Sequence, residues 1–284
     1  MICFIILSVL SSVLDNALNN YAGKRFSDKD SVVKSFQQLA FGACFLICFV
    51  LACFEKASLY SILLGVLFGI MTFVGRRFWI LAMAEGPMHI TILVTTASML
   101  IPTLSGVLFF GEDFSAFKLI AVVFLIVFLY LASATKSGGG VNGKWFLFCG
   151  LSFLGTGLVG VLQKVHQSSP HSGEFYSFLA SAFLISVMIT FLLNRPRNGE
   201  KEKMPSRMYW FALVSGICVF AMYAINTKLS GVLPSQLFFP LINGSNVIFS
   251  SVVAVVIFKE RLSAKQIVGM IGGMLSLVAI CTLP

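Results

Sequence analysis

The sequence predicts an all-α membrane protein of ten transmembrane helices, arranged as two inverted five-helix repeats. Three observations support this prediction: the composition, the regular succession of apolar runs, and a motif that occurs twice. Of the 284 residues, 58% are hydrophobic and only 11% are charged. A soluble domain needs enough polar surface to face water, so we expect a chain this apolar to have lipid as its solvent.

The apolar runs define the expected helices. A spanning helix needs about 20 predominantly apolar residues, and five such runs lie on each side of a Gly-rich polar break at 135–144. The expected helices are 2–21, 32–54, 59–84, 88–110, 114–134, 145–165, 175–193, 208–229, 235–258 and 264–283. No basic segment precedes the first run, so we interpret it as a spanning helix and not as a cleaved signal peptide.

A short motif that opens the fifth expected helix recurs at the opening of the tenth. Residues 110–116 read FGEDFSA and residues 258–264 read FKERLSA, at an offset of 148. Pro87 and Pro234 recur at an offset of 147. An internal duplication explains both matches. The expected organisation is a first repeat at 1–136, a linker at 137–144 and a second repeat at 145–284.

The number of helices per repeat and the basic residues predict the topology. Five is odd, so the second copy enters the membrane from the opposite side and the repeats are inverted. Fourteen Lys and Arg residues lie near the loops of one side and four near those of the other. By the positive-inside rule the basic side is cytoplasmic. We therefore expect both termini outside, in a multi-pass protein of the plasma or inner membrane.

Several function classes do not fit the sequence. The net charge of +9 comes from short basic patches between apolar runs, which argues against nucleic-acid binding. The seven cysteines lack metal-ligand spacing, and we interpret them as small buried hydrophobic residues. No His-Glu-x-x-His or Gly-x-Ser-x-Gly motif is present. We expect no enzyme activity, no catalytic residues, no metal and no cofactor.

Two segments of the second half resemble a known family. Residues 230–244 read SGVLPSQLFFPLING, and with FKERLS at 258–263 they resemble the closing repeat of the drug/metabolite transporter superfamily, in its EamA-like branch. The segment 86–115 echoes them in the first half. The resemblance implies a ten-helix carrier of small solutes such as amino acids, driven by an ion gradient or by exchange. The first helix departs from the family, because Asp15-Asn16 stands where many members carry a Trp-Gly-Ser-Asn type of stretch.

A polar stripe on the ninth expected helix indicates a solute site. Gln236, Asn243 and Ser250 recur every seven residues and share one face. A shift of 147 places these three on the fourth helix at His89, Thr96 and Thr103. Such a stripe lines a cavity or contacts another helix, and Ser or Thr can alternatively bond to its own helix.

The same shift relates the third and eighth expected helices, because Arg76 and Trp79 fall on Tyr223 and Asn226. Arg76 would face the cavity, where it favours an anionic or zwitterionic solute, or would extend to the membrane boundary. Trp79 would stack on the solute or lie at the lipid interface.

Asp15 is the only carboxylate well inside an apolar run, and with Asn19 it is our candidate for proton coupling. The alternative is a structural hydrogen bond with the neighbouring asparagines. Asn19 and Asn20 recur as Gln163 and Lys164 at an offset of 144, and this set either contributes to function or is structural, with Lys164 extending to the interface.

The remaining motifs are interpreted as structural. Glu112 and Glu260 are expected to cap the helix that follows each of them. Gly-x-x-x-Gly faces at 65–69 and 269–273 allow close helix packing, and the second could alternatively form a homodimer seam. The prolines expected to begin, break or kink helices are Pro87, Pro102, Pro234 and Pro240.

Together these features predict a secondary transporter of a small metabolite, working by alternating access at a midplane site between the repeats. Its expected partners are the solute, the lipid bilayer and a coupling proton, with a homodimer as an open possibility. A non-transporting accessory subunit or a channel is the alternative, and an intramembrane enzyme is the least favoured. A channel would need a continuous ring of like residues, which the polar stripe of this sequence does not supply.

Overall fold

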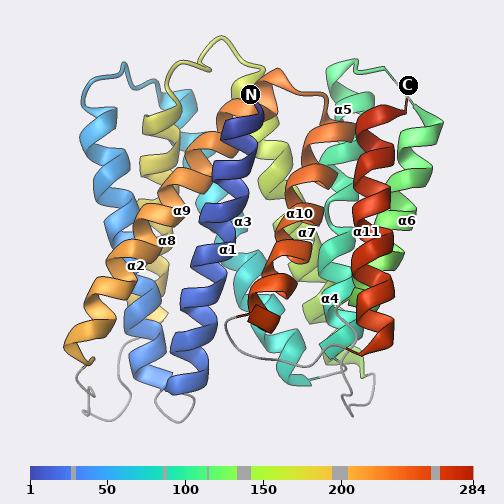
Figure 1. Ribbon diagram of the computed structural model, residues 1–284. Coiled ribbons are helices and arrows are strands. Elements are labelled where there is room, and N and C mark those ends of the chain that lie inside the picture. The colour runs from blue at the N-terminus through green and yellow to red at the C-terminus, as the bar shows by residue number, and fades with distance from the viewer. Residues whose placement is uncertain are drawn as a thin grey trace. The chain divides into compact units, whose positions relative to one another are not determined.

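The computed structural model of the chain describes residues 1–26, 30–85, 88–113, 115–132, 142–193, 204–256 and 263–283. Its regular structure is helical in all these segments (Figure 1). The helices are α1 (Ile2–Arg25), α2 (Asp30–Ala52), α3 (Leu59–Glu85), α4 (Met88–Ala97), α5 (Leu100–Phe110), α6 (Ala116–Ala132), α7 (Gly143–Gln167), α8 (Phe175–Leu193), α9 (Ser206–Val232), α10 (Ser235–Val256) and α11 (Ala264–Thr282).

Eight of the described helices are long and apolar enough to cross a membrane: α1, α2, α3, α7, α8, α9, α10 and α11. Two shorter apolar segments, Val94–Phe110 and Ala116–Ala132, accompany them. Large apolar side chains are widely exposed, with Phe54 at 85% and Phe109 at 78% of their full area. Because water would penalise such a surface, length and composition identify a multi-pass membrane protein.

The expected fourth helix is not continuous, and the structure divides it into α4 and α5. The interruption is a turn at Ser98 and Met99, in which the Ile101 N–H donates to the Ser98 carbonyl. Pro102 has no N–H for that carbonyl, and its ring would clash with it in a regular helix. Pro240, in contrast, lies inside α10 without dividing it.

Two compact units make up the structure, and each draws on both halves of the sequence. Unit 1 contains Met1–Ile70 and Ser169–Lys228, and unit 2 contains Met71–Ser168 and Leu229–Pro284. The packing units therefore do not coincide with the expected repeats at 1–136 and 145–284. The duplication is a statement about sequence and stays a prediction.

In unit 1, α8 packs along α2 on one side and against α3 on the other. A Cβ atom on Gly65 or Gly69 of α3 would lie 2.2 Å from the carbonyl oxygen of Phe178 or Ala182, respectively. Such a clash would force the two helices apart, so the 65–69 glycines do serve close packing.

Two carboxylates tie the connections of unit 1 together. Glu55, after α2, accepts the Tyr176 N–H at 2.9 Å at the start of α8. Glu174, before α8, accepts the Ser58 N–H at 2.9 Å at the start of α3, as well as the Ser58 and Ser61 hydroxyls. These hydroxyl and N–H donors lower the pKa of Glu174 to about 2, whereas burial raises the pKa of Glu55. Each carboxylate also complements a helix N-terminus.

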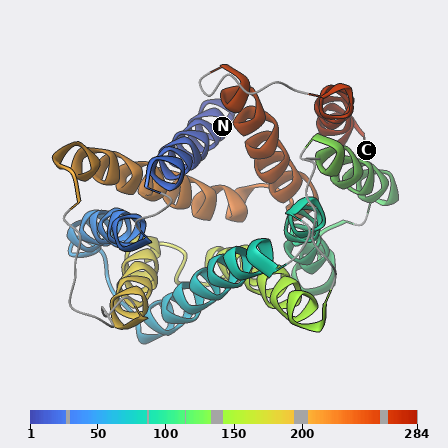
Figure 2. The same ribbon diagram turned by 90° about the horizontal axis from the view of Figure 1, so that it is seen from below.

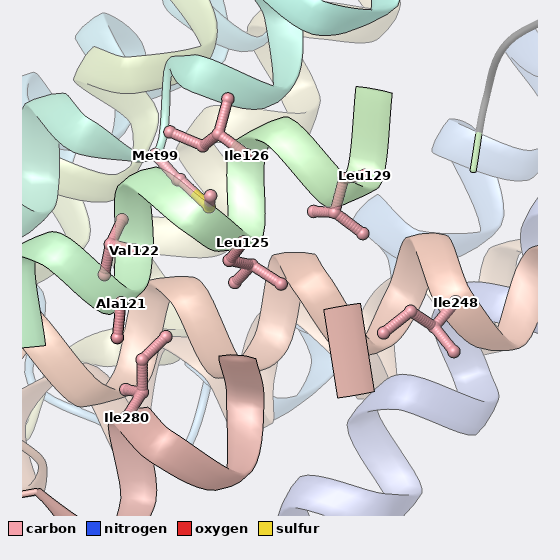
Figure 3. Packing of buried hydrophobic residues seen from close by; sticks show 8 residues of the cluster. All are labelled: Met99, Ala121, Val122, Leu125, Ile126, Leu129, Ile248 and Ile280. Atoms are coloured by element: carbon pink, nitrogen blue, oxygen red, sulfur yellow. The ribbon is translucent and has the colours of Figure 1, made fainter. Parts of the chain in front are cut away.

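In unit 2, α6 and α11 lie side by side over their length (Figures 1 and 2). Gly269 and Gly272 of α11 lie against Phe128 and Ala132 of α6, so α6 occupies this glycine face within the unit. A buried apolar cluster fills the space between α6, α10, α11 and the turn before α5 (Figure 3). Its members are Met99, Ala121, Val122, Leu125, Ile126, Leu129, Ile248 and Ile280.

Candidate functional site

A polar seam between α1 and α9 surrounds the buried Asp15 in unit 1. Asp15 is 8% exposed and accepts a hydrogen bond at its Oδ1 from the Ser215 hydroxyl at 2.5 Å. The Asn19 side-chain amide donates to the same oxygen at 2.9 Å and to the Asp15 carbonyl at 2.8 Å. Neutral donors from its own helix and from α9 thus contribute to satisfying a buried carboxylate within an apolar helix.

The seam continues along α1 toward its N-terminus. The Ser8 hydroxyl donates to the Asn226 side-chain carbonyl of α9 at 2.6 Å. Ser8, Ser11, Ser12 and Asp15 are all buried, at helical spacing. The small hydroxyls allow α1 and α9 to approach and supply hydrogen bonds that lipid cannot. The structure therefore brings Asp15, Asn19 and Asn226 together on one helix pair.

Tyr223 lies one turn from Asn226 but in an aromatic setting. Its half-buried ring packs edge-on against Phe68 of α3 at 5.7 Å and against Phe183 of α8 at 5.4 Å, measured between ring centroids. These contacts fix the ring beside the seam.

A second polar cluster lies in unit 2, where an ion pair joins α7 to two turns. Lys164 Nζ is 2.6 Å from Glu112 Oε1, and the two side chains are 8% and 14% exposed. Lys164 also donates to the Leu233 carbonyl at 3.3 Å. The Glu112 carboxylate accepts the Ser235 N–H at 2.6 Å and the Ser235 hydroxyl at 3.0 Å. The α5–α6 turn is thereby fastened to the start of α10.

This cluster bears on two expectations. Lys164 is held by Glu112 and the Leu233 carbonyl, so its ammonium has protein partners and little exposure, and its position relative to the interface stays a prediction. Glu112 is a helix cap as expected, but of α10 and not of α6, since Gly111 turns the chain at φ 64° and the carboxylate reaches Ser235. Glu260, its counterpart, lies outside the described residues.

Gln236, in the first turn of α10, belongs to the same region. It is 3% exposed, and its Oε1 accepts the Ser115 N–H at 3.3 Å. Its buried Nε2 has no hydrogen-bond partner among the described residues. Seven residues on, Asn243 is exposed and donates to the Phe239 carbonyl of its own helix at 2.8 Å. The expected stripe therefore has a buried and an exposed member.

The other expected site residues also lie in unit 2. On α3, Arg76 is half-buried and Trp79 is 36% exposed. On α4, Thr96 is half-buried, and the side chain of His89 lies outside the described residues. Thr103 donates to the Met99 carbonyl at 2.7 Å, which is the own-helix bonding considered as its alternative.

Sequence reasoning did not single out Ser8 or Ser215. The serines at 8, 11 and 12 carry a signal, because they continue the helical face of Asp15 through an apolar run. Ser215 has no such signal, since only the packing of α9 on α1 makes it a partner. Among the described residues, no three His, Cys, Asp or Glu side chains could together hold a metal ion.

Comparison with known proteins identifies the fold alone. No family model matches the chain, and no curated protein matches it. One solved structure, described only as "Crystal structure of protein", is similar with a TM-score of 0.72 at 15% sequence identity. The match covers 99% of this chain and 98% of that one. At this identity the similarity extends to chain topology and not to activity.

Proposed function

We propose that this chain is a secondary transporter of a small metabolite, of the EamA-like branch of the drug/metabolite transporter superfamily, coupled to protons through Asp15. The observation that carries the proposal is the buried carboxylate of Asp15 within an apolar spanning helix. An ionisable group at such a position is costly, so it indicates a pathway or a proton relay.

The chemistry around Asp15 suits a group that changes its protonation state. Ser215 donates to the carboxylate, and a hydroxyl can equally accept a hydrogen bond from a protonated carboxyl. Asn19 likewise offers a donor to Oδ1 and has an acceptor oxygen of its own. Ser215 and Asn19 can therefore each form a hydrogen bond with either protonation state of Asp15. In an alternating-access cycle the carboxyl would take a proton on one side and release it on the other.

Transport by the reconstituted protein tests the proposal. Liposomes containing the protein are supplied with radiolabelled amino acids or cationic drugs, with and without an imposed pH gradient. We expect uptake that follows the gradient, and we expect Asp15→Asn to abolish it while solute–solute exchange continues. Asp113→Asn, which removes an exposed carboxylate from the turn after α5, is the matched control and should transport normally.

The outcomes separate the alternatives. Gradient-driven uptake that survives Asp15→Asn would remove Asp15 from coupling and return it to a structural role. Flux without saturation or exchange would indicate a channel. If no solute moves under any gradient, the carrier proposal fails in favour of a non-transporting accessory subunit.

A further inference from the structure

An elongated apolar groove runs along unit 1 between α2, α8 and α9. Its volume is about 760 Å³, and its lining on α2 extends from Ser35 to Ile47. That span corresponds to about 18 Å of helix, slightly more than half of the roughly 30 Å hydrocarbon core of a bilayer. The groove is therefore as long as one leaflet is deep. Figure 2 shows α2, α8 and α9 as neighbours within the unit.

The groove has one polar end. Ser35 and Gln38, in the first turns of α2, contribute its hydroxyl and amide groups, and the rest of its lining is aliphatic, aromatic or glycine apart from the Trp210 indole. Trp210, in the second turn of α9, is 71% exposed at the same end. Amphipathic rings of this kind prefer the boundary between headgroups and hydrocarbon. The polar end thus has the side chains that suit the level of lipid headgroups.

Basic residues gather at this end. Arg207 is exposed one turn before Trp210 and lies on the same face of α9. Arg25 is exposed at the end of α1, whose last turns pack with the beginnings of α2 and α9 around Phe36 and Met208. A guanidinium pairs well with a phosphate, and a basic cluster beside a spanning helix attracts anionic lipid.

We propose that this groove binds one anionic glycerophospholipid, with an acyl chain along α2 and α9 and its phosphate at Arg207, Ser35 and Gln38. Gly42, midway along the α2 wall, supports the depth of the groove. A Cβ atom on Gly42 would meet no other atom within 4 Å, so that position opens onto free space. A small polar solute would find no partners along the apolar wall, whereas an acyl chain matches it.

Fluorescence quenching by brominated lipids tests the proposal. The full chain is reconstituted in bilayers with increasing fractions of dibrominated phosphatidylglycerol or dibrominated phosphatidylcholine. Emission from Trp210 is the difference between the wild type and Trp210→Phe, because Trp79 and Trp145 contribute to both. We expect the phosphatidylglycerol to quench at a lower mole fraction. Gly42→Leu should fill the groove and remove this preference, whereas Gly150→Leu, at an equally open glycine of α7, should leave it intact.

A charge variant tests the headgroup site without altering the groove. Arg207→Gln should reduce the preference for phosphatidylglycerol about fivefold at low salt, as one basic residue near a membrane surface contributes. Lys265→Gln, at the start of α11 in unit 2, should not. Equal quenching by both lipids, unchanged in Gly42→Leu, would show that Trp210 meets only bulk lipid and would overturn the proposal. An unquenched Trp210 in a dimer that Gly42→Leu dissociates would also overturn it, because the groove would then be a seam between two copies of this chain.

Discussion

The ion pair of Lys164 with Glu112 gives a stability prediction whose size follows from its surroundings. Both side chains are largely buried, at 8% and 14% exposure, and their charged atoms are 2.6 Å apart. Removing one partner of a buried pair leaves an uncompensated charge and costs about 3–5 kcal/mol. We take the lower part of this range, because Glu112 keeps some contact with solvent.

The two single variants should not cost the same. Lys164→Met leaves the Glu112 carboxylate with two donors from Ser235, which offset part of this cost, so we expect a loss below that range, of about 2 kcal/mol. Glu112→Gln leaves the Lys164 ammonium with the Leu233 carbonyl at 3.3 Å as its acceptor. The new amide N–H can face the ammonium, so we expect a loss of stability of about 3 kcal/mol. The double variant removes both charges and should be no less stable than Glu112→Gln alone.

Equilibrium unfolding in mixed detergent micelles measures these free energies, with exposure of buried thiols as the signal. The buried cysteines that would report it are Cys44, Cys48, Cys149 and Cys218. If both single variants lowered the free energy of unfolding by less than about 0.5 kcal/mol, the conclusion that the ion pair is buried and stabilising would be refuted. A double variant whose cost equals the sum of the single costs would show that the two residues do not interact.

Three further predictions concern unit 1 and use the same unfolding measurement. Gly69→Ala should lower stability by about 2 kcal/mol, since the added Cβ would overlap the α8 backbone, whereas Gly42→Ala should raise it by about 0.5 kcal/mol through helix propensity. Glu174 has its pKa lowered from 4.5 to about 2, so its stabilisation is complete above about pH 4.5 and is lost as the pH falls toward 2. Glu174→Gln should therefore flatten that part of the pH profile, and an unchanged profile would contradict the assignment. Ser215→Ala should cost about 1–2 kcal/mol in the wild type and clearly less in an Asp15→Ala background, and equal costs in both would show that the hydroxyl does not serve Asp15.

The helices could be predicted closely because lipid imposes a length and a composition on each of them. The expected 175–193 agrees with α8 at both ends, and most other expected helices agree within a few residues. A break or kink was expected at both Pro102 and Pro240. The helix is divided at Ser98, just before Pro102, whereas Pro240 lies inside an undivided helix. Proline makes an interruption possible, and the surrounding packing decides whether it occurs.

The partners of the polar residues could be predicted only where they are local. Asn19 lies four residues from Asp15, so their hydrogen bond follows from helical periodicity. Lys164 and Glu112 lie 52 residues apart, and neither sequence segment contains a pattern that predicts contact with the other. Sequence periodicity shows which face of a helix is polar. Only the packing of helices and turns shows which residues of other elements that polar face contacts.

The predicted duplication adds a constraint on how the proposed coupling could work. At the offset of 144 that relates Asn20 to Lys164, Asp15 falls on Val159, so the second half has no carboxylate at that position. The charged residue of the second half that this offset matches to the first helix is Lys164, and it forms an ion pair with Glu112. Ser215 and Asn19, which donate to Asp15, are neutral and can serve either protonation state. A coupled cycle built on Asp15 would therefore have its ionisable group in the first half alone, with Val159 at the matching position of the second half.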